Sequence, residues 1–118
     1  MMYQIDVKKF MDACDQPSNE GWGDQATLYM NLITEEYEET LCAFIDKDIV
    51  EVADGLADMV WVIMGMANTI GIPFDDVWAQ VRESNMSKCV DGKVIKNEAG
   101  KVMKPDTFFE PDIARVLK

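Results

Sequence analysis

The sequence contains no histidine and only three cysteines, which removes several kinds of catalytic and metal site. Without histidine there is no Ser-His-Asp or Cys-His arrangement, and no Glu-x-x-His pair of the kind that holds two iron ions in helical bundles. Cys14, Cys42 and Cys89 are odd in number and widely spaced, with no Cys-x-x-Cys pair among them. This pattern predicts free thiols in the reducing cytoplasm.

Positive charge is also scarce. Eleven Lys and Arg stand against 22 Asp and Glu, for a net charge of −11, and neither basic residue occurs between Lys47 and Arg82. A nucleic-acid or anionic-membrane surface needs clustered basic side chains, so we expect neither partner. The most apolar run, residues 59–74, contains Asn68 and Thr69 and is shorter than the roughly 20 residues of a membrane span. It predicts a buried helix.

The 118 residues are enough for one compact domain, so we expect a single domain over residues 1–118. Apolar spacing and Gly or Pro breaks predict a short helix near the N-terminus, two long helices, a fourth helix and a final turn after Pro111. The expected helices cover residues 5–14, 25–45 (with Asp24 as N-cap), 49–70 and 74–88. The fold class is therefore all-α, a bundle of four to five helices with an irregular or hairpin-like C-terminal segment.

Three glutamates lie among the apolar positions of the first long helix. At 100° per residue, Glu35, Glu36 and Glu39 fall within an arc of about 100°. The same arc contains Leu28 and Leu32, so the acids continue an apolar stripe.

The second long helix is apolar in almost every direction except along one strip. Glu51, Asp54 and Asp58 have the spacing i, i+3, i+7, which places them within about 60° of one another. Trp61 extends this strip toward the C-terminal end of the helix.

The simplest interpretation of these acids is a solvated helix face. However, they share faces with apolar residues, and none has a Lys or Arg four residues further on. Burying uncompensated carboxylates costs on the order of several kcal/mol each, which predicts a cation between the two helices. Oxygen ligands without His or Cys favour Mg²⁺, Mn²⁺ or Ca²⁺ over zinc or copper.

Several motifs now carry a family resemblance. They are EEYEE (35–39), EVADGLADMVWVIMG (51–65), SNMSK (84–88), DGKVIKNEAGKVMKP (91–105) and EPDI (110–113). Over about residues 28–113, the sequence resembles the MazG-like all-α nucleoside triphosphate pyrophosphohydrolases. This superfamily also includes phosphoribosyl-ATP pyrophosphohydrolases and dimeric dUTPases.

The resemblance implies hydrolysis of a nucleoside triphosphate, a deoxynucleotide in our interpretation, to the monophosphate and pyrophosphate. Mg²⁺, or Mn²⁺ in its place, would be held by acids of both clusters, namely Glu35, Glu36, Glu39, Asp58, Asp54 and Glu51. Glu35 or Glu36 would accept the proton of the attacking water.

One position departs from the family pattern. The usual second motif is Glu-x-x-Asp, and if Asp58 is its Asp, the Glu position is occupied by Gly55. Asp54 or Glu51 would then replace the missing ligand. Alternatively, Glu51 and Asp54 form the Glu-x-x-Asp motif and Asp58 assists them. We rank Asp58 first, Asp54 second and Glu51 third.

The remaining predictions concern substrate and assembly. We expect Asn85, Lys88, Lys101 and Lys104 to contact phosphate or sugar and Trp61 to stack on the base. A helix that is apolar nearly all round needs additional partners, and the family's solution is a homodimer or homotetramer. The alternative is a helical oligomer that binds a nucleotide or a partner protein without catalysis. The preferred nucleotide stays open, with deoxynucleotides, dUTP, damaged nucleotides and phosphoribosyl-ATP among the candidates.

Overall fold

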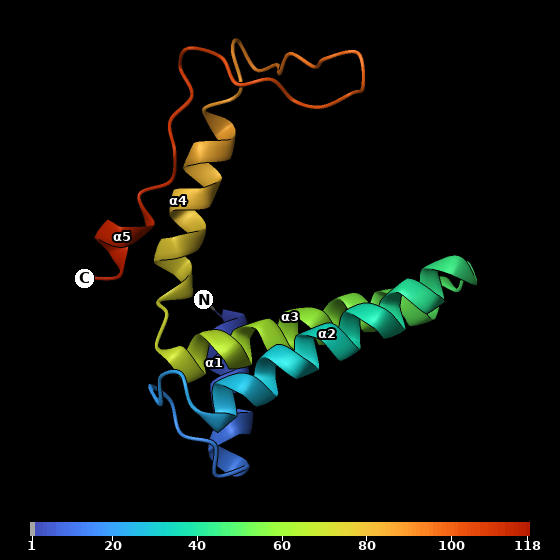
Figure 1. The fold of residues 1–118 in the computed structure, drawn as a ribbon, viewed down its shortest axis with the longest axis vertical. Coiled ribbons are helices and arrows are strands. Elements are labelled where there is room, and N and C mark those ends of the chain that lie inside the picture. The colour runs from blue at the N-terminus through green and yellow to red at the C-terminus, as the bar shows by residue number, and fades with distance from the viewer. Residues whose placement is uncertain (1) are drawn as a thin grey trace. The chain divides into compact units, whose positions relative to one another are not determined.

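The computed structural model describes residues 2–118, and these residues form five helices (Figure 1). They are α1 (Met2–Ala13), α2 (Asp24–Ile45), α3 (Ile49–Ile70), α4 (Phe74–Met86) and α5 (Ile113–Val116). The predicted all-α class is confirmed. The chain divides into two compact units, the first ending at Phe74 and the second beginning at Asp75, and each is described separately.

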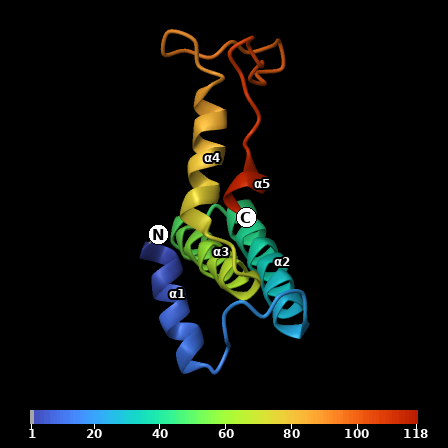
Figure 2. The ribbon, with the colours of Figure 1, turned by 90° about the vertical axis from the view of Figure 1, so that its left-hand side faces the viewer.

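Helices α2 and α3 form an antiparallel hairpin and lie side by side in both views (Figures 1 and 2). At the turn, Asp48 caps α3 by accepting a hydrogen bond from the backbone N–H of Glu51 at 3.2 Å. At its other end, α3 stops at Gly71, whose φ of 86° lies in the left-handed region that favours glycine. The predicted N-cap of α2 is wrong by one residue, because Gly23 occupies that position and Asp24 is already helical. No helix within residues 2–118 is long and apolar enough to cross a membrane.

Two glycines set the register of this hairpin. A Cβ on Gly55 would collide with the side chain of Thr40, and a Cβ on Gly65 would collide with the ring of Tyr29. The helices therefore approach most closely where α3 carries no side chain. The same register places Glu36 of α2 across from the turn of α3 that carries Asp58.

Helix α1 completes the core of the first unit. Its Val7 and Met11 are almost fully buried and pack in one cluster with Tyr29, Val62 and Met64. Polar contacts add to this packing, since the Asn68 side-chain amide donates to the carbonyl of Gln4 at 3.2 Å. Helix α1 is thereby held against the C-terminal half of α3.

The second unit is built on α4 and an extended return segment. The hydroxyl of Ser84 donates to the carbonyl of Phe109 at 2.8 Å, and the N–H of Asp112 donates to Gln80 Oε1 at 3.0 Å. Between α4 and the return segment, the chain forms turns closed by two isolated bridges, Val90 with Lys93 and Lys96 with Val102. The predicted hairpin-like segment is present as turns and has no strand within the described residues.

Candidate active site

Glu36 and Asp58 point into the seam between α2 and α3. On α2, Glu36 lies on the face of Thr40, which packs against Gly55, and on α3, Asp58 lies on the face of buried Val62. Each side chain is half-buried, although each belongs to a residue type that is almost never buried without a partner. The antiparallel packing thus brings together acids that are 22 positions apart in the sequence.

Burial and neighbouring charge both act on Glu36. Its Oε2 atom has almost no exposed surface, and it is one of two buried side-chain oxygens in residues 2–118 that lack a hydrogen-bond partner. Loss of hydration raises the pKa of this carboxyl, and four neighbouring carboxylates raise the pKa further, in decreasing order Asp58, Glu39, Glu35 and Asp54. Glu36 is therefore the centre of a cluster of five acids drawn from both helices.

Asp58 and Asp54 form a second pair within this cluster. The pKa of Asp58 is raised by burial, then by the charge of Asp54 and by a hydrogen bond between the two side chains. Such a hydrogen bond needs a proton, because two ionised carboxylates offer only acceptors. Glu51 lies one turn closer to the start of α3 and is exposed, and among the described residues it is not one of the acids that raise either pKa.

Packing explains the departure at position 55. Gly55 is buried against Thr40, and a built Cβ would lie 3.0 Å from Thr40 Cβ and still closer to its hydroxyl. The Thr40 hydroxyl donates to the backbone carbonyl of Glu36 at 2.7 Å, so it is tied to the same turn that carries the central acid. A glutamate does not fit at position 55, and Asp54, one residue earlier, is the acid that reaches Asp58.

The chemistry of the cluster fits a hard divalent cation. A buried carboxylate oxygen without a donor, surrounded by four more carboxylates, is an uncompensated negative site, and Mg²⁺ and Mn²⁺ prefer such oxygen ligands. Within residues 2–118, however, no three Asp, Glu or Cys side chains lie in an arrangement that could hold a metal ion, so the carboxylates would have to reorient to bind one. The acids that would hold the cation are Glu36 and Asp58 in the seam, with Glu35, Glu39 and Asp54 around them.

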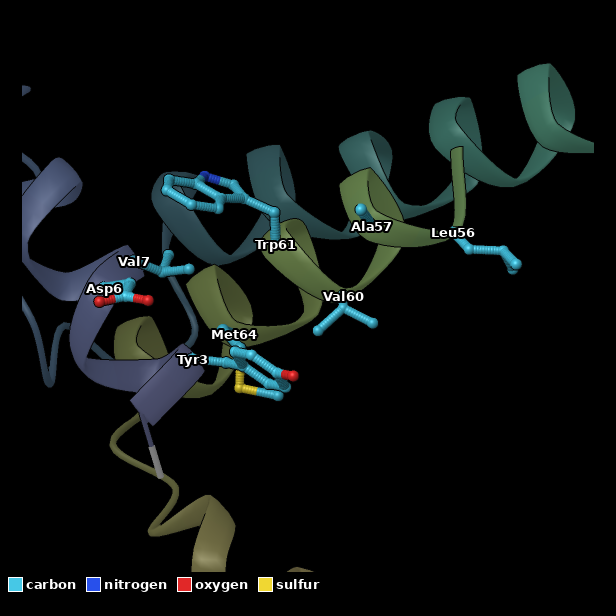
Figure 3. A pocket seen from close by; sticks show the side chains of 8 residues that line it. All are labelled: Tyr3, Asp6, Val7, Leu56, Ala57, Val60, Trp61 and Met64. Carbon is cyan, nitrogen blue, oxygen red and sulfur yellow. The ribbon is translucent and has the colours of Figure 1, made fainter. Parts of the chain in front are cut away.

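Trp61 lies one turn beyond Asp58 and lines a cavity between α1 and α3 (Figure 3). The cavity has a volume of about 400 Å³, and Val60, Met64 and Leu56 of α3 form part of its apolar wall. Trp61 is 40% exposed, and its ring meets Phe10 of α1 edge to face, with the ring centroids 5.5 Å apart. The residue predicted to stack on a base is thus oriented by α1.

Tyr3 and Asp6 of α1 also line the cavity, and the sequence predicted a role for neither. In Figure 3 the Tyr3 ring and the Trp61 ring lie on different sides of the cavity, and the Asp6 carboxylate lies near its α1 end. The sequence feature that could have indicated a shared position is spacing, because Tyr3, Asp6 and Val7 have the i, i+3, i+4 pattern of one helix face.

The second unit places two of the predicted phosphate contacts at one aromatic ring, and a third is hydrogen-bonded to one of them. Lys88 Nζ lies 5.8 Å and Lys104 Nζ 4.9 Å from the centroid of Phe108. Lys88 also donates to Asn85 Oδ1 at 3.0 Å, and Lys104 lies 3.8 Å from the carboxylate of Glu110. These contacts hold two ammonium groups on one aromatic platform.

Lys101 does not belong to this group. It lies in the exposed turn at residues 97–101, where its backbone N–H donates to Asn97 Oδ1 at 2.9 Å.

Comparison with known proteins identifies the family. The model of the phosphoribosyl-ATP pyrophosphohydrolase family matches residues 7–85, which include both acidic helices and end at Asn85, before the lysines of the second unit. No curated protein matches the chain closely enough to add a relative. Because the match spans more than half of the sequence and contains all five clustered acids, the chain belongs to the phosphoribosyl-ATP pyrophosphohydrolase family, whose members cleave a nucleotide phosphoanhydride.

Proposed function

We propose that this protein hydrolyses a deoxynucleoside triphosphate to the monophosphate and pyrophosphate, with Mg²⁺ or Mn²⁺ held by the acids between α2 and α3. The observation that carries the proposal is the buried, unpartnered Oε2 of Glu36, surrounded by carboxylates of both helices. When bound, the cation would neutralise phosphate charge and lower the pKa of a coordinated water. An acidic cluster needs such a cation before it can accept a triphosphate.

The two neighbouring glutamates of α2 take different roles. Glu36 is central and half-buried, so we assign it to the cation, together with Asp58, Asp54 and Glu39. Glu35 is exposed beside it and accepts the proton from the water that attacks the α-phosphorus, because attack there releases pyrophosphate. Glu51 is assigned only a long-range electrostatic contribution.

We assign the lysines beside the Phe108 ring of the second unit to phosphate binding. Lys88 and Lys104 share the Phe108 ring, and the Asn85 amide lies against Lys88. Phosphate oxygens accept hydrogen bonds from ammonium groups, so a phosphate group bound at these lysines would displace the weak contact between Lys104 and Glu110. Lys101 contributes general positive charge from its turn.

The decisive experiment measures pyrophosphate release from a panel of nucleoside triphosphates in Mg²⁺ and in Mn²⁺. We expect activity that Glu36→Gln, Glu39→Gln and Asp58→Asn each reduce by at least about 100-fold, with the helical circular dichroism spectrum retained. Glu35→Gln is expected to lower kcat while Mg²⁺ still raises the Tm, which separates proton transfer from cation binding.

Glu38→Gln is the matched control, because Glu38 is an exposed glutamate of α2 that lies on the opposite side of the helix from Glu36. Full activity in Glu36→Gln or Asp58→Asn would show that the cation ligands are assigned wrongly. Mg²⁺-dependent nucleotide binding without any pyrophosphate release would instead favour a non-catalytic nucleotide-binding oligomer.

A further inference from the structure

We propose that the cavity between α1 and α3 binds the base of the substrate, and that Asp6 makes it select guanine over thymine and uracil. The inference rests on the proposed function for the identity of the ligand as a nucleotide. It adds a specificity-determining residue and a substrate preference.

The size and lining of the cavity suit a nucleobase. Its volume of about 400 Å³ is in the range of small-molecule sites, and its lining is almost entirely apolar, including Val7, Val60 and Met64. Among the described residues that line it, Asp6 is the only charged one, and it is exposed. An apolar pocket with one polar group orients a flat ligand through that group.

Two aromatic rings supply stacking surfaces. Tyr3 comes from α1 and Trp61 from α3, and both are partly exposed, at 60% and 40%. The edge contact with Phe10 holds the Trp61 ring in place before any ligand arrives, which reduces the entropy lost on binding. Stacking of a base on such rings is largely independent of which base it is, so Trp61 provides affinity and leaves discrimination to Asp6.

A carboxylate distinguishes bases by their hydrogen-bond donors, because it can only accept. Guanine presents adjacent N1–H and N2–H donors, which match the two oxygens of Asp6. Cytosine and adenine each present one amino group beside a ring-nitrogen acceptor. Thymine and uracil present a single N–H between two carbonyl oxygens, and these oxygens repel a carboxylate.

Only one edge of the cavity lies near the acids. Trp61 follows Asp58 by three residues on α3, about 4.5 Å along the helix axis and about 60° around it, whereas Leu56, Val60 and Met64 lie about 120° to 160° around the helix from Asp58. A base stacked on Trp61, at this edge, would have its sugar and α-phosphate directed around α3 toward Asp58. All of these residues belong to the first unit.

The test uses non-hydrolysable α,β-methylene analogues of dGTP and dTTP in Mg²⁺, with affinity measured by calorimetry. We expect the dGTP analogue to bind at least about tenfold more tightly, because hydrogen bonds to a charged acceptor are stronger than neutral ones. Asp6→Asn is expected to remove most of this ratio, while Asp12→Asn, on the same helix but outside the cavity, keeps it. In a variant with Trp22→Phe and Trp78→Phe, base binding is expected to quench the remaining Trp61 fluorescence.

Equal affinities for the two analogues, an unchanged ratio in Asp6→Asn, or no change of Trp61 fluorescence on binding would each overturn the inference. The last result is also expected if a second copy of the chain fills the cavity. Since the analogues report binding alone, a base preference without hydrolysis would support this inference while refuting the proposed activity. Hydrolysis without a base preference would support the proposed activity while refuting this inference.

Discussion

The raised pKa of Glu36 makes the stability of the metal-free protein depend on pH. Between the ordinary carboxyl pKa and the raised pKa, the folded state binds more protons than the unfolded state, so the free energy of unfolding falls as pH rises through that window. Asp58 contributes in the same direction. This is opposite to the usual effect of a salt-bridged carboxylate, whose pKa is lowered by folding.

We predict that Glu36→Gln raises the Tm at neutral pH in a chelator and flattens its pH dependence, because the variant no longer carries a buried charge beside four carboxylates. The measurement is thermal unfolding from about pH 4 to pH 8, the range in which carboxyl groups with raised pKa values titrate. Glu38→Gln is the control and is expected to leave the profile unchanged. A lower Tm in Glu36→Gln at neutral pH would mean that the charge is compensated inside the protein.

At the level of single residues, the sequence indicated acids that the structure brings together, while their role as a site stays a prediction. Acids at helical spacing among apolar residues, without basic partners, were enough to single out Glu36, Glu39, Asp58 and Asp54. The order among Asp58, Asp54 and Glu51 depended on which turn of α3 faces Glu36. The facing turn is set by the register of the α2–α3 hairpin, and the spacing of residues within one helix does not determine this register.

At the level of elements, the contact between α2 and α3 depends on Gly55. Substituting alanine for glycine within a helix normally stabilises it by about 1 kcal/mol. Here we predict the opposite sign, a loss of about 1–3 kcal/mol in Gly55→Ala, because the added methyl group overlaps the Thr40 side chain. The measurement is urea unfolding of the metal-free protein.

A double-mutant cycle tests the cause of this loss. Thr40→Ala removes the hydroxyl and methyl groups nearest to position 55, so it is expected to recover part of the stability when it is combined with Gly55→Ala. Additive effects of the two substitutions would show that the clash lies elsewhere.

Helix boundaries were largely predictable because they depend on local chemistry. Asp48 and Gly71 flank the second long helix as a good N-cap and a left-handed terminal residue, and α3 has those limits. The errors are small. Helix α1 runs from Met2 to Ala13, so it begins three residues before the predicted Ile5 and ends one before the predicted Cys14. Helix α2 begins one residue before the predicted start, at Asp24, and α4 ends at Met86, before the predicted Lys88. Helix ends vary by a residue or two with the packing of the flanking loops.

At the level of the whole molecule, the turn of the α2–α3 hairpin exposes a group of large apolar side chains. Phe44, Ile45, Ile49 and Val50 are between 67% and 76% exposed. Apolar residues gathered at one exposed site are typical of an interaction surface. We propose that this turn takes part in a homodimer or homotetramer.

We predict that sedimentation velocity shows a dimer or tetramer at micromolar concentration and that Ile49→Asp shifts it toward smaller species. Aspartate suits the first turn of a helix, so this substitution is not expected to harm α3 itself. Ile95→Asp is the control, because Ile95 is 65% exposed in the second unit. A monomer in the wild type, or an unchanged assembly in Ile49→Asp, would exclude the turn as an interface.

The sequence by itself determined the all-α class, the limits of the long helices and the acidic composition of both faces, because helical periodicity and caps are properties of neighbouring residues. Only the tertiary structure decided that Glu36 loses its hydration, that Gly55 is a contact between helices, and that Tyr3 and Asp6 share a cavity with Trp61. Each of these depends on side chains brought together from different helices. Burial and electrostatic coupling are set by distance in space, and spacing along one helix does not determine them.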